Sequence, residues 1–284
     1  RCRVDKAGDG MICVLVLLSF FYPLSQQVFS PSFTQFLIDS YGLPAAKIFI
    51  RPDFGVEGSF GGGDKKGGLS RRPVVIVHGV TNTITTFNFT RDYLLSHNFS
   101  SSQVFGTTYG EGPRRFVIFV KLECHYVRQI RVFIEAVHLY TGMQVDIIAY
   151  SMGSPITRKA LLGGDCEGIA LGPPLTDDVY TFISVAGANY GSSQCIVPVG
   201  ICNEDNGLSC ASAFLEELNN QPNRYEGRRT YAIYSEDDDK VGMDCCGHNC
   251  SSLPHATDQF IYKGWGHDGV MKGTLKQQLR LLLS

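Results

Sequence analysis

One stretch constrains this chain more than any other: residues 145–153, which read VDIIAYSMG. Its apolar half is typical of a buried strand, and Ser151 follows directly, between Ala149 and Gly153. In a nucleophile elbow a strand ends abruptly, the next helix begins, and a serine occupies the strained turn between them. Small residues on both sides let the two backbones approach each other. The usual pattern begins with Gly, so this stretch is a variant, and an ordinary strand-to-helix turn is the alternative.

Apolar patterns on either side of this stretch alternate between strand and helix. A β-branched run at 73–77 indicates a buried parallel strand, and the apolar stripe over 126–141 indicates a helix that Gly142 ends. The same reasoning gives strands at 179–186, 229–235 and 259–262, and helices at 32–41 (ended by Pro44), 87–95, 157–162, 211–219 and 274–283. This alternation predicts an α/β fold with one mostly parallel, doubly wound sheet and helices on both faces.

The glycine-rich stretch 55–68 and the overall composition exclude several functions. Its segment 61–66 lacks the Gly-Lys-Ser/Thr ending of a phosphate-binding loop, so we expect a flexible connection there and no nucleotide site. The chain has 284 residues, 44% hydrophobic and 18% charged, which is typical of a globular protein. A formal net charge of -2 does not indicate nucleic-acid binding or a polybasic membrane patch.

Residues 11–25 form an apolar run that ends at Pro23 and continues into small and polar residues. The run is short for a membrane span and suits a secretory signal, with a single membrane anchor as the alternative. We expect Met11 to be the initiator. The sequence therefore predicts an N-terminal extension and signal peptide at 1–27, a folded domain at 28–284, and secretion of the chain.

Eight cysteines follow this segment, and an even number behind a signal peptide predicts disulfides in an oxidising compartment. They are Cys124, Cys166, Cys195, Cys202, Cys210, Cys245, Cys246 and Cys250. Sequons at Asn88, Asn98 and Asn249 fit the same compartment and predict a glycoprotein. Zinc binding by the Cys/His cluster at 245–250 is the weaker interpretation in a secreted chain.

Three reactive groups follow predicted strands, in the order Ser151, the aspartates 237–239, and His267. The carboxyl ends of strands meet at one edge of such a sheet, and this order is that of α/β-hydrolases. Ser151 is a poor nucleophile until His267 takes its proton, and a carboxylate must hold the imidazole in one tautomer. The backbone amides of Val80 and Met152 are the expected donors of an oxyanion hole.

Position along the chain selects among the three aspartates. The preceding strand should end just before them, which puts Asp237 on the bend and makes Asp238 the first that can turn toward the histidine loop. Asp237 is the runner-up, and Asp239 is expected to face solvent. His78 also lies near the site, but we expect it to be a structural hydrogen-bonding residue and not the base.

Four motifs together resemble one family. They are residues 73–80 (PVVIVHGV), the elbow 149–153 (AYSMG, including its first Ala), Ile233-Tyr-Ser followed by Asp238, and residues 264–267 (GWGH). On these residues the chain resembles the class 2 lipases, which include the small secreted Bacillus-type lipases, and most closely their secreted nematode branch. The resemblance spans residues 73–270. It departs between 111 and 122, where the run 113–120 (PRRFVIFV) does not look like a loop of the family.

The resemblance implies an α/β-hydrolase fold and a secreted, monomeric serine ester hydrolase that cleaves acylglycerols or other lipid esters at a lipid–water interface. It implies Ser151, Asp238 and His267 as catalytic residues, and Val80 and Met152 as the oxyanion hole. It implies no cofactor, no metal, no nucleic-acid partner and no stable membrane insertion. The alternatives are a carboxylesterase for small soluble esters and a catalytically inactive hydrolase-fold binding protein, although the filled triad positions argue against the latter.

The segment 189–210 is expected to lie over the entrance to the site. It follows a strand whose carboxyl end faces the site, and its run 196–199 (IVPV) is apolar without a helix or strand pattern. We interpret it as a partial cap held by disulfides among Cys195, Cys202 and Cys210. A surface loop is the alternative.

Overall fold

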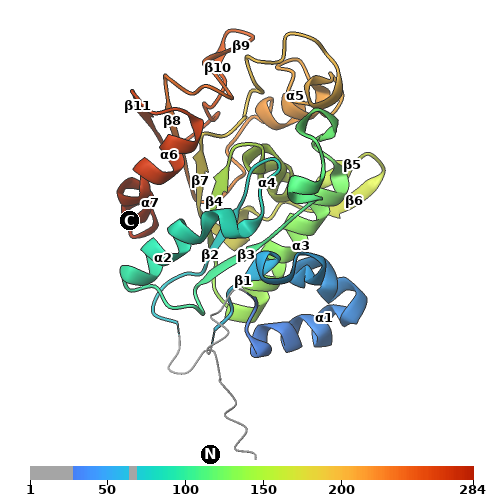
Figure 1. Cartoon of the computed structure of the whole chain (residues 1–284), viewed down its shortest axis with the longest axis vertical. Helices are drawn as coiled ribbons and strands as arrows, with labels where there is room; N and C mark the ends of the chain where they lie inside the picture. Colours follow the sequence, from blue (N-terminus) through green and yellow to red (C-terminus); the bar gives the residue numbers. More distant parts are fainter. Residues whose placement is uncertain (1–27, 64–68) are drawn as a thin grey trace, which may run out of the picture.

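The computed structural model describes residues 28–63 and 69–284. The predicted signal peptide, and the cleavage expected to remove it, lie outside these residues. Figure 1 shows a twisted central sheet with helices on either side of it. Ser151 and His267 are far apart in the sequence. They meet at one end of this sheet.

Seven strands form the central sheet. In spatial order they are β1 (Ser59–Phe60), β3 (Val104–Thr107), β2 (Val74–Val77), β4 (Val145–Tyr150), β7 (Val179–Val185), β8 (Arg229–Ser235) and β11 (Asp258–Tyr262). Every neighbouring pair is parallel except β1 with β3. The prediction of a mostly parallel, doubly wound sheet is therefore confirmed. Two short antiparallel hairpins lie outside it, β5 (Gly164–Cys166) with β6 (Ile169–Gly172), and β9 (Asp244–Cys245) with β10 (His248–Asn249).

Side chains that alternate along each strand build two apolar cores, one on each face of the sheet. In β2, Val75 and Val77 belong to one core, while Val74 and Ile76 belong to the other. A strand buried on both faces carries no polar side chain in its interior, which explains the continuous β-branched run in the sequence. Burial on both sides fixes the strand register, because a slip by one residue would exchange the two faces.

Helices cover both faces. The first core is covered by α1 (Pro31–Ile50), α3 (Cys124–Thr141), α4 (Gly153–Leu162) and α5 (Ala213–Asn219), and the second by α2 (Asn88–Ser96), α6 (His267–Gly273) and α7 (Leu275–Leu282). Single 3-10 turns are η1 (Pro52–Glu57), η2 (Ile84–Phe87), η3 (Gly112–Arg114), η4 (Val117–Phe119), η5 (Thr176–Asp178) and η6 (Gly200–Cys202). In the part of the chain that the structure describes, no helix combines the length and the apolar character that crossing a membrane requires.

Several elements differ from the sequence prediction. The first helix does not end at Pro44: it kinks at Gly42, where φ is 77°, and a further helical stretch follows with the proline in its first turn. Strand β3 was not predicted because it is short and contains Gly106, which offers no apolar pattern. A Cβ atom at Gly106 would lie 2.4 Å from Ile84, so packing requires glycine there. Strand β1 likewise lies within the stretch predicted to be loop.

All eight cysteines of the domain form disulfides, as predicted. The pairs are Cys124–Cys166, Cys195–Cys202, Cys210–Cys246 and Cys245–Cys250. One pair closes the segment 189–210 on itself, and Cys210 joins this segment to the loop after β8. The expectation that Cys210 pairs within the segment is therefore wrong, because its partner lies 36 residues further along the chain.

A buried ion pair holds the helix that follows the elbow. Arg158 on α4 is fully buried, and its Nε lies 2.9 Å from Oε1 of Glu226. The same guanidinium donates to the side chain of Asn219 and to the carbonyl of Leu218, both at the end of α5. Paired and fully hydrogen-bonded, this charge tolerates burial and fixes α4 against α5. The start of α4, and with it the elbow, is thereby anchored.

Candidate active site

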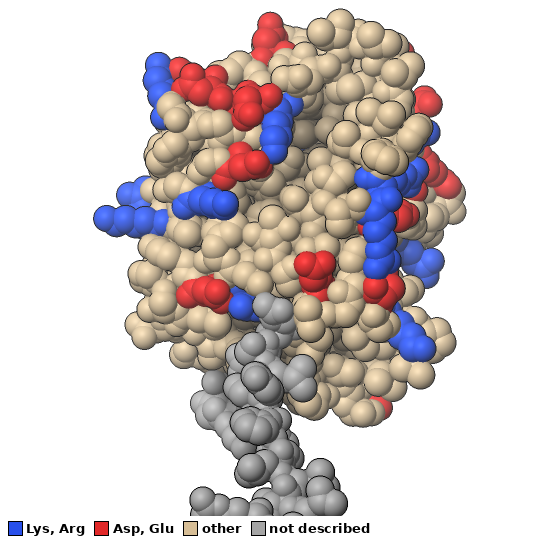
Figure 2. Space-filling view, viewed as in Figure 1, with Lys and Arg blue, Asp and Glu red and all other residues tan. Residues whose placement is uncertain are grey.

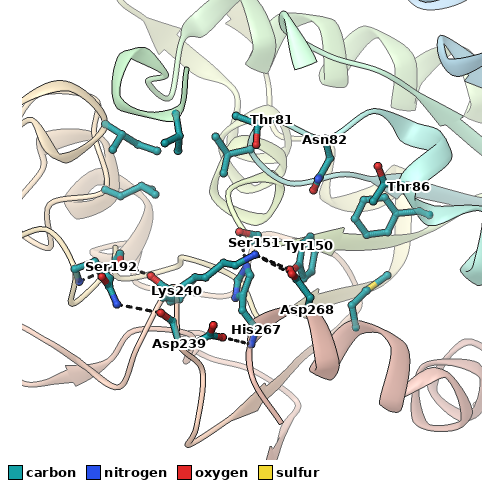
Figure 3. Close-up of a pocket in the computed structure, with 18 of the residues that line it drawn as sticks. Thr81, Asn82, Thr86, Tyr150, Ser151, Ser192, Asp239, Lys240, His267 and Asp268 are labelled. Atoms are coloured by element: carbon teal, nitrogen blue, oxygen red, sulfur yellow. Dashed lines mark hydrogen bonds and ion pairs between the residues drawn. The ribbon is translucent and has the colours of Figure 1, made fainter. Parts of the chain in front are cut away.

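The structure brings the three predicted reactive residues into one hydrogen-bonded chain. Nε2 of His267 lies 2.9 Å from Oγ of Ser151, and Nδ1 of the same ring lies 2.8 Å from Oδ2 of Asp238. Ser151 ends β4, Asp238 follows β8, and His267 opens α6. Their exposed fractions are 6%, 6% and 3%, so all three are largely shielded from bulk water, and Ser151 and His267 line a pocket. Figure 3 shows the serine and the imidazole facing each other at the floor of this pocket.

The backbone at Ser151 has the conformation expected of an elbow. Its φ is 54°, in the left-handed region that costs a residue with a side chain about 1 kcal/mol or more. A Cβ atom at Gly153 would lie 2.3 Å from the carbonyl oxygen of His78, and one at Gly79 would lie 2.9 Å from Cβ of Ser151. Glycine is therefore required at 153 because the end of β2 packs directly against the turn.

Asp238 is held as an anion that faces the histidine. Oδ1 accepts hydrogen bonds from the amides of Lys240 and Val241, at 2.9 and 2.8 Å, which leaves Oδ2 for the imidazole. Burial alone would raise the pKa of Asp238, but the hydrogen bond from His267 and those from the two amides outweigh burial and lower the pKa. The carboxylate is thus charged at neutral pH and fixes which ring nitrogen carries the proton.

The two neighbouring aspartates bind the backbone of the histidine loop. Oδ1 of Asp239 accepts from the amide of His267 at 2.7 Å, and Oδ2 of Asp237 accepts from the amide of Gly264. Amides in the first turn of a helix have no partner within the helix, so Asp239 caps α6 at the histidine itself. Asp239 is exposed, as expected, but it does not simply face solvent. Pattern reasoning missed this role, since a side chain bonded to backbone leaves no periodic signal.

The two amides predicted to meet an oxyanion lie beside the serine. Val80 lines the pocket, and Met152 is the residue that directly follows Ser151. Within residues 28–63 and 69–284, neither amide donates a hydrogen bond to another protein group. Two unused donors close to a nucleophile are what a developing negative charge on a carbonyl oxygen requires.

His78 fixes the orientation of the Val80 amide. Its Nε2 accepts from the amide of Tyr109 at 3.0 Å, so Nδ1 must carry the proton and donates to the carbonyl of Gly79 at 2.8 Å. The peptide between Gly79 and Val80 is planar and trans, so its N–H points away from that carbonyl. Burial lowers the pKa of His78 from its ordinary value of 6.5 to about 4. A neutral ring with both nitrogens engaged is a structural residue and not a base.

The serine opens onto a pocket of about 650 Å³. Its apolar lining comes from the loop after β2, η2, α2, η4, the segment 189–210, the loop after β8 and α6. The residues are Val80, Phe87, Phe89, Val117, Ile201, Leu208, Val241 and Met271. A pocket of this size and character suits a largely apolar ligand with one polar group at its reacting end.

A polar network borders the pocket beside the triad. The hydroxyl of Tyr150 donates to Oδ1 of Asp268 at 2.8 Å, and Nζ of Lys240 contacts both oxygens of the same carboxylate at 2.9 and 2.8 Å (Figure 3). Burial raises the pKa of Tyr150, so its hydroxyl remains a donor. The sequence analysis did not single out these residues. Their positions in the sequence could have indicated a place near the site, because Tyr150 directly precedes the serine and Asp268 directly follows the histidine.

The segment 189–210 forms one wall of the pocket. Ser192 donates to the carbonyl of Lys240, and Gln194 donates to the carbonyl of Asp239, so the segment is attached to the loop that carries the acid. Its apolar run, however, points away from the pocket: Ile196 is 87% exposed. The segment thus borders the entrance, but it does not close it with the apolar run that suggested a cap.

The alternative zinc site does not have the ligands that it requires. The cysteines of the 245–250 cluster are all in disulfides and offer no thiolate for zinc.

The chain is similar to known lipases in sequence and in structure. A sequence model of the class 2 lipases matches residues 71–280. No curated protein matches the chain in sequence at a significant level. The chain is similar in structure to the mature lipase of Bacillus licheniformis, with a TM-score of 0.57 and 17% identity over 80% of this chain and 98% of that one.

Two further structures are similar. For Aspergillus fumigatus lipase B the TM-score is 0.55 and the identity 18%, over 77% of this chain and 53% of the fungal chain. For the monoacylglycerol lipase of Paleococcus ferrophilus they are 0.51 and 12%, over 79% and 96%. At such identities the likeness concerns the fold alone.

The first prediction from this geometry concerns the aspartates. Asp238→Asn replaces the acceptor that faces Nδ1 and favours the wrong imidazole tautomer, so turnover of a soluble ester should fall by about 10⁴-fold. Asp237→Asn and Asp239→Asn keep an oxygen that can accept from backbone amides, so they should retain activity within about tenfold. Steady-state kinetics on the three matched variants measures this. Near-normal turnover of Asp238→Asn would contradict the assignment.

The second prediction concerns the pH dependence of stability. Between pH 6.5 and about 4 the unfolded chain binds a proton at His78 that the folded chain excludes, so stability falls as the pH falls through this range. The contribution is about 3 kcal/mol at most. His78→Gln keeps one donor and one acceptor but does not titrate, so urea unfolding across this range should show a shallower decline for the variant. Parallel curves for variant and wild type would show that His78 is not buried in its neutral form.

Proposed function

This chain belongs to the class 2 lipases and has the α/β-hydrolase fold, and we propose that it hydrolyses lipid esters by nucleophilic attack of Ser151. The observation that carries the proposal is the hydrogen-bonded chain from Asp238 through His267 to Ser151, at the floor of an apolar pocket. As a member of this family the protein is an ester-hydrolysing enzyme.

The reaction we propose has two halves. Oγ of Ser151 bonds to the ester carbonyl carbon while Nε2 of His267 takes the hydroxyl proton, and the carbonyl oxygen becomes an oxyanion facing the amides of Val80 and Met152. The intermediate then expels the alcohol, which receives the proton from His267, and leaves an acyl-serine. Water, deprotonated by the same nitrogen, bonds to the acyl carbon; the bond to Oγ of Ser151 then breaks, Oγ regains the proton from His267, and the fatty acid leaves. Asp238 stabilises the imidazolium each time it forms.

The apolar pocket supports a lipid ester as substrate. Eight apolar side chains line it, and Ser151 and His267 are among the polar residues that border it. The competing function is a carboxylesterase for small soluble esters, which the same triad would serve. The two differ in whether long acyl chains presented at an interface are preferred over dissolved short ones.

A covalent probe and a substrate comparison test the proposal together. A fluorophosphonate should label the wild type and not Ser151→Ala, and the variant should lose hydrolysis of a soluble ester by about 10⁴-fold or more. Ser193→Ala, which changes an exposed serine of the same pocket wall segment, should keep both. A lipase should favour emulsified long-chain acylglycerols, whereas a preference for dissolved short-chain esters would support the carboxylesterase. A wild type that neither reacts nor hydrolyses would indicate a binding protein.

We further infer that the chain is exported and acts outside the cell as a monomeric glycoprotein. Four disulfides support an oxidising compartment, because the reducing cytosol does not maintain such bonds. N-terminal sequencing of the exported protein should find a mature terminus between residues 26 and 30. A secreted protein that retains residues 11–24 would contradict the assignment of a signal peptide.

A further inference from the structure

Lys240 and Asp268 form an ion pair that lines the pocket in front of Ser151. Nζ of Lys240 lies 2.9 Å from Oδ1 and 2.8 Å from Oδ2 of Asp268. The two side chains are 55% and 68% exposed, so a ligand in the pocket can reach both. An ion pair this exposed contributes little to stability, so its place in the pocket indicates a role toward the ligand.

The carboxylate of this pair is fixed from the protein side. Tyr150 is buried at the end of β4, and its hydroxyl donates to Oδ1 of Asp268 at 2.8 Å. Burial alone would raise the pKa of Asp268, but hydrogen bonds from Lys240 and Tyr150 outweigh burial and lower the pKa, so the group is an anion at neutral pH. Among the described residues, these contacts occupy three of the roughly four lone-pair positions of the carboxylate and two of the three protons of the ammonium. Each partner therefore keeps capacity for a ligand.

The pair lies on the histidine side of the pocket. Asp268 directly follows His267 in α6, and the ring of Tyr150 packs against the imidazole with 4.9 Å between the ring centroids. Figure 3 shows Lys240 and Asp268 meeting beside His267. In the proposed reaction Nε2 of His267 gives its proton to the departing alcohol oxygen, so that oxygen must lie next to the imidazole. The alcohol part of the substrate is thereby directed to the side on which the ion pair lies.

Apolar side chains line the pocket from a different part of the chain. Val117, Ile201 and Leu208 come from η4 and the segment 189–210, neither of which carries a residue of the predicted triad. Figure 2 shows the molecule hollowed in its upper half, with charged side chains of both signs along one edge of the hollow and a broad uncharged area along another. The walls of the pocket thus differ: one suits an acyl chain, and another presents a hydrogen-bond acceptor and a donor.

We propose that Asp268 and Lys240 bind the alcohol part of the substrate, and that this alcohol carries free hydroxyl groups next to the ester bond, as in a monoacylglycerol. The inference rests on the proposed function, because only ester cleavage by Ser151 defines an alcohol side. One hydroxyl donates to the carboxylate and its neighbour accepts from the ammonium, so adjacent hydroxyls match the pair. A plain alkyl alcohol would displace water from both charges without replacing its hydrogen bonds.

Charge on the pocket lining favours a neutral alcohol over an anionic one. Among the described residues, the ionised side chains that line the pocket are Lys240, Lys272, Asp239 and Asp268, which sum to no net charge. Lys240 is paired with Asp268, and Nζ of Lys272 lies 5.6 Å from the centroid of the Phe89 ring, an attractive cation–π position. A phosphate group would therefore meet no excess of positive charge, and a polyol needs none. The substrate class that fits is a partial ester of a polyol.

Two esters that differ only in the alcohol test this assignment. 1-Butyrylglycerol and propyl butyrate share the acyl chain and the carbon skeleton of the alcohol, and only the first has free hydroxyls. Both are compared as dissolved substrates by kcat/KM, in the wild type and in the separate variants Asp268→Asn and Lys240→Met. Asp268→Asn keeps an oxygen for the Tyr150 hydroxyl, and Lys240→Met keeps an unbranched side chain without its charge. Labelling by the fluorophosphonate shows that each variant retains a folded site.

The matched control is an ion pair that lies outside the pocket and also joins the loop after β8 to the chain after β11. Nζ of Lys263 lies 2.8 Å from Oε2 of Glu236, and neither residue lines the pocket. Lys263→Met and Glu236→Gln should keep the wild-type preference between the two esters.

The wild type should hydrolyse 1-butyrylglycerol with the higher kcat/KM, and the ratio of the two values should fall about tenfold or more in Asp268→Asn and in Lys240→Met. The different reactivity of the two alcohols cancels in this comparison, because it is the same for every variant. A substitution that only displaces His267 lowers both values in equal proportion. A ratio unchanged in both variants, or a wild type that prefers propyl butyrate, overturns the inference.

A second measurement follows the alcohol in the reverse direction, with glycerol or propan-1-ol added during hydrolysis of a butyrate ester. The alcohol oxygen bonds to the acyl carbon while Nε2 of His267 takes its proton; the bond to Oγ of Ser151 then breaks, and Oγ regains the proton. Both alcohols react with the same acyl-serine. Glycerol should be acylated more efficiently than propan-1-ol by the wild type, and it should lose this advantage in Asp268→Asn and in Lys240→Met. Equal acylation by the wild type contradicts the proposed subsite.

These outcomes separate failure of this inference from failure of the proposed function. Hydrolysis of both esters without discrimination refutes the alcohol subsite alone and leaves Ser151 as the nucleophile. A wild type that hydrolyses neither ester and does not react with the fluorophosphonate refutes the proposed function, and the subsite with it.

Discussion

The arrangement of the site depends on the close approach of two backbones, the end of β2 and the turn at Ser151. The carbonyl of His78 occupies the space that a side chain at Gly153 would need, and the Gly79 backbone lies against the serine Cβ. This contact sets the distance between the nucleophile and the Val80 amide, which follows β2 directly. A hydrogen-bond donor contributes to transition-state stabilisation only if it is in place before the charge develops. If the Val80 amide acts as we propose, the approach of the two backbones supplies that preorganisation, and the neutral His78 ring holds the peptide in the orientation that exposes its N–H.

The other side of the site is organised by three consecutive aspartates that act on one loop. Asp238 binds the imidazole, while Asp237 and Asp239 bind backbone amides on either side of it. The histidine ring and its main chain are therefore fixed by the same short segment after β8. Orientation of the ring is restricted at both ends, which matters because a small displacement of a catalytic group has a large effect on rate.

Sequence reasoning identified the residues that parallel-sheet geometry brings together, and it failed where contacts cross between loops. Ser151, Asp238 and His267 follow separate strands, and the carboxyl ends of parallel strands converge, so their proximity could be predicted. The partner of Cys210 could not, because cysteine spacing does not determine disulfide connectivity. Strand β3 could not be predicted for a different reason. Packing against Ile84 requires glycine at position 106, and this glycine interrupts the apolar pattern by which a strand is recognised.

Residues 111–122, which we expected to depart from the family pattern, expose apolar side chains beside the pocket, with Phe116 at 78%. Residues 111–122 leave the sheet, the elbow and the histidine loop untouched, and η4 within them reaches the pocket only through Val117. A loop in this position can change without altering the distances among the reacting groups, which are set by β2, β4 and β8. The opposing loop from η6 is held independently, by its own disulfide and by hydrogen bonds to the acid loop. The fold thus separates two requirements: rigid strand ends set the distances among the predicted reacting groups, and the two loops at the pocket mouth shape its entrance.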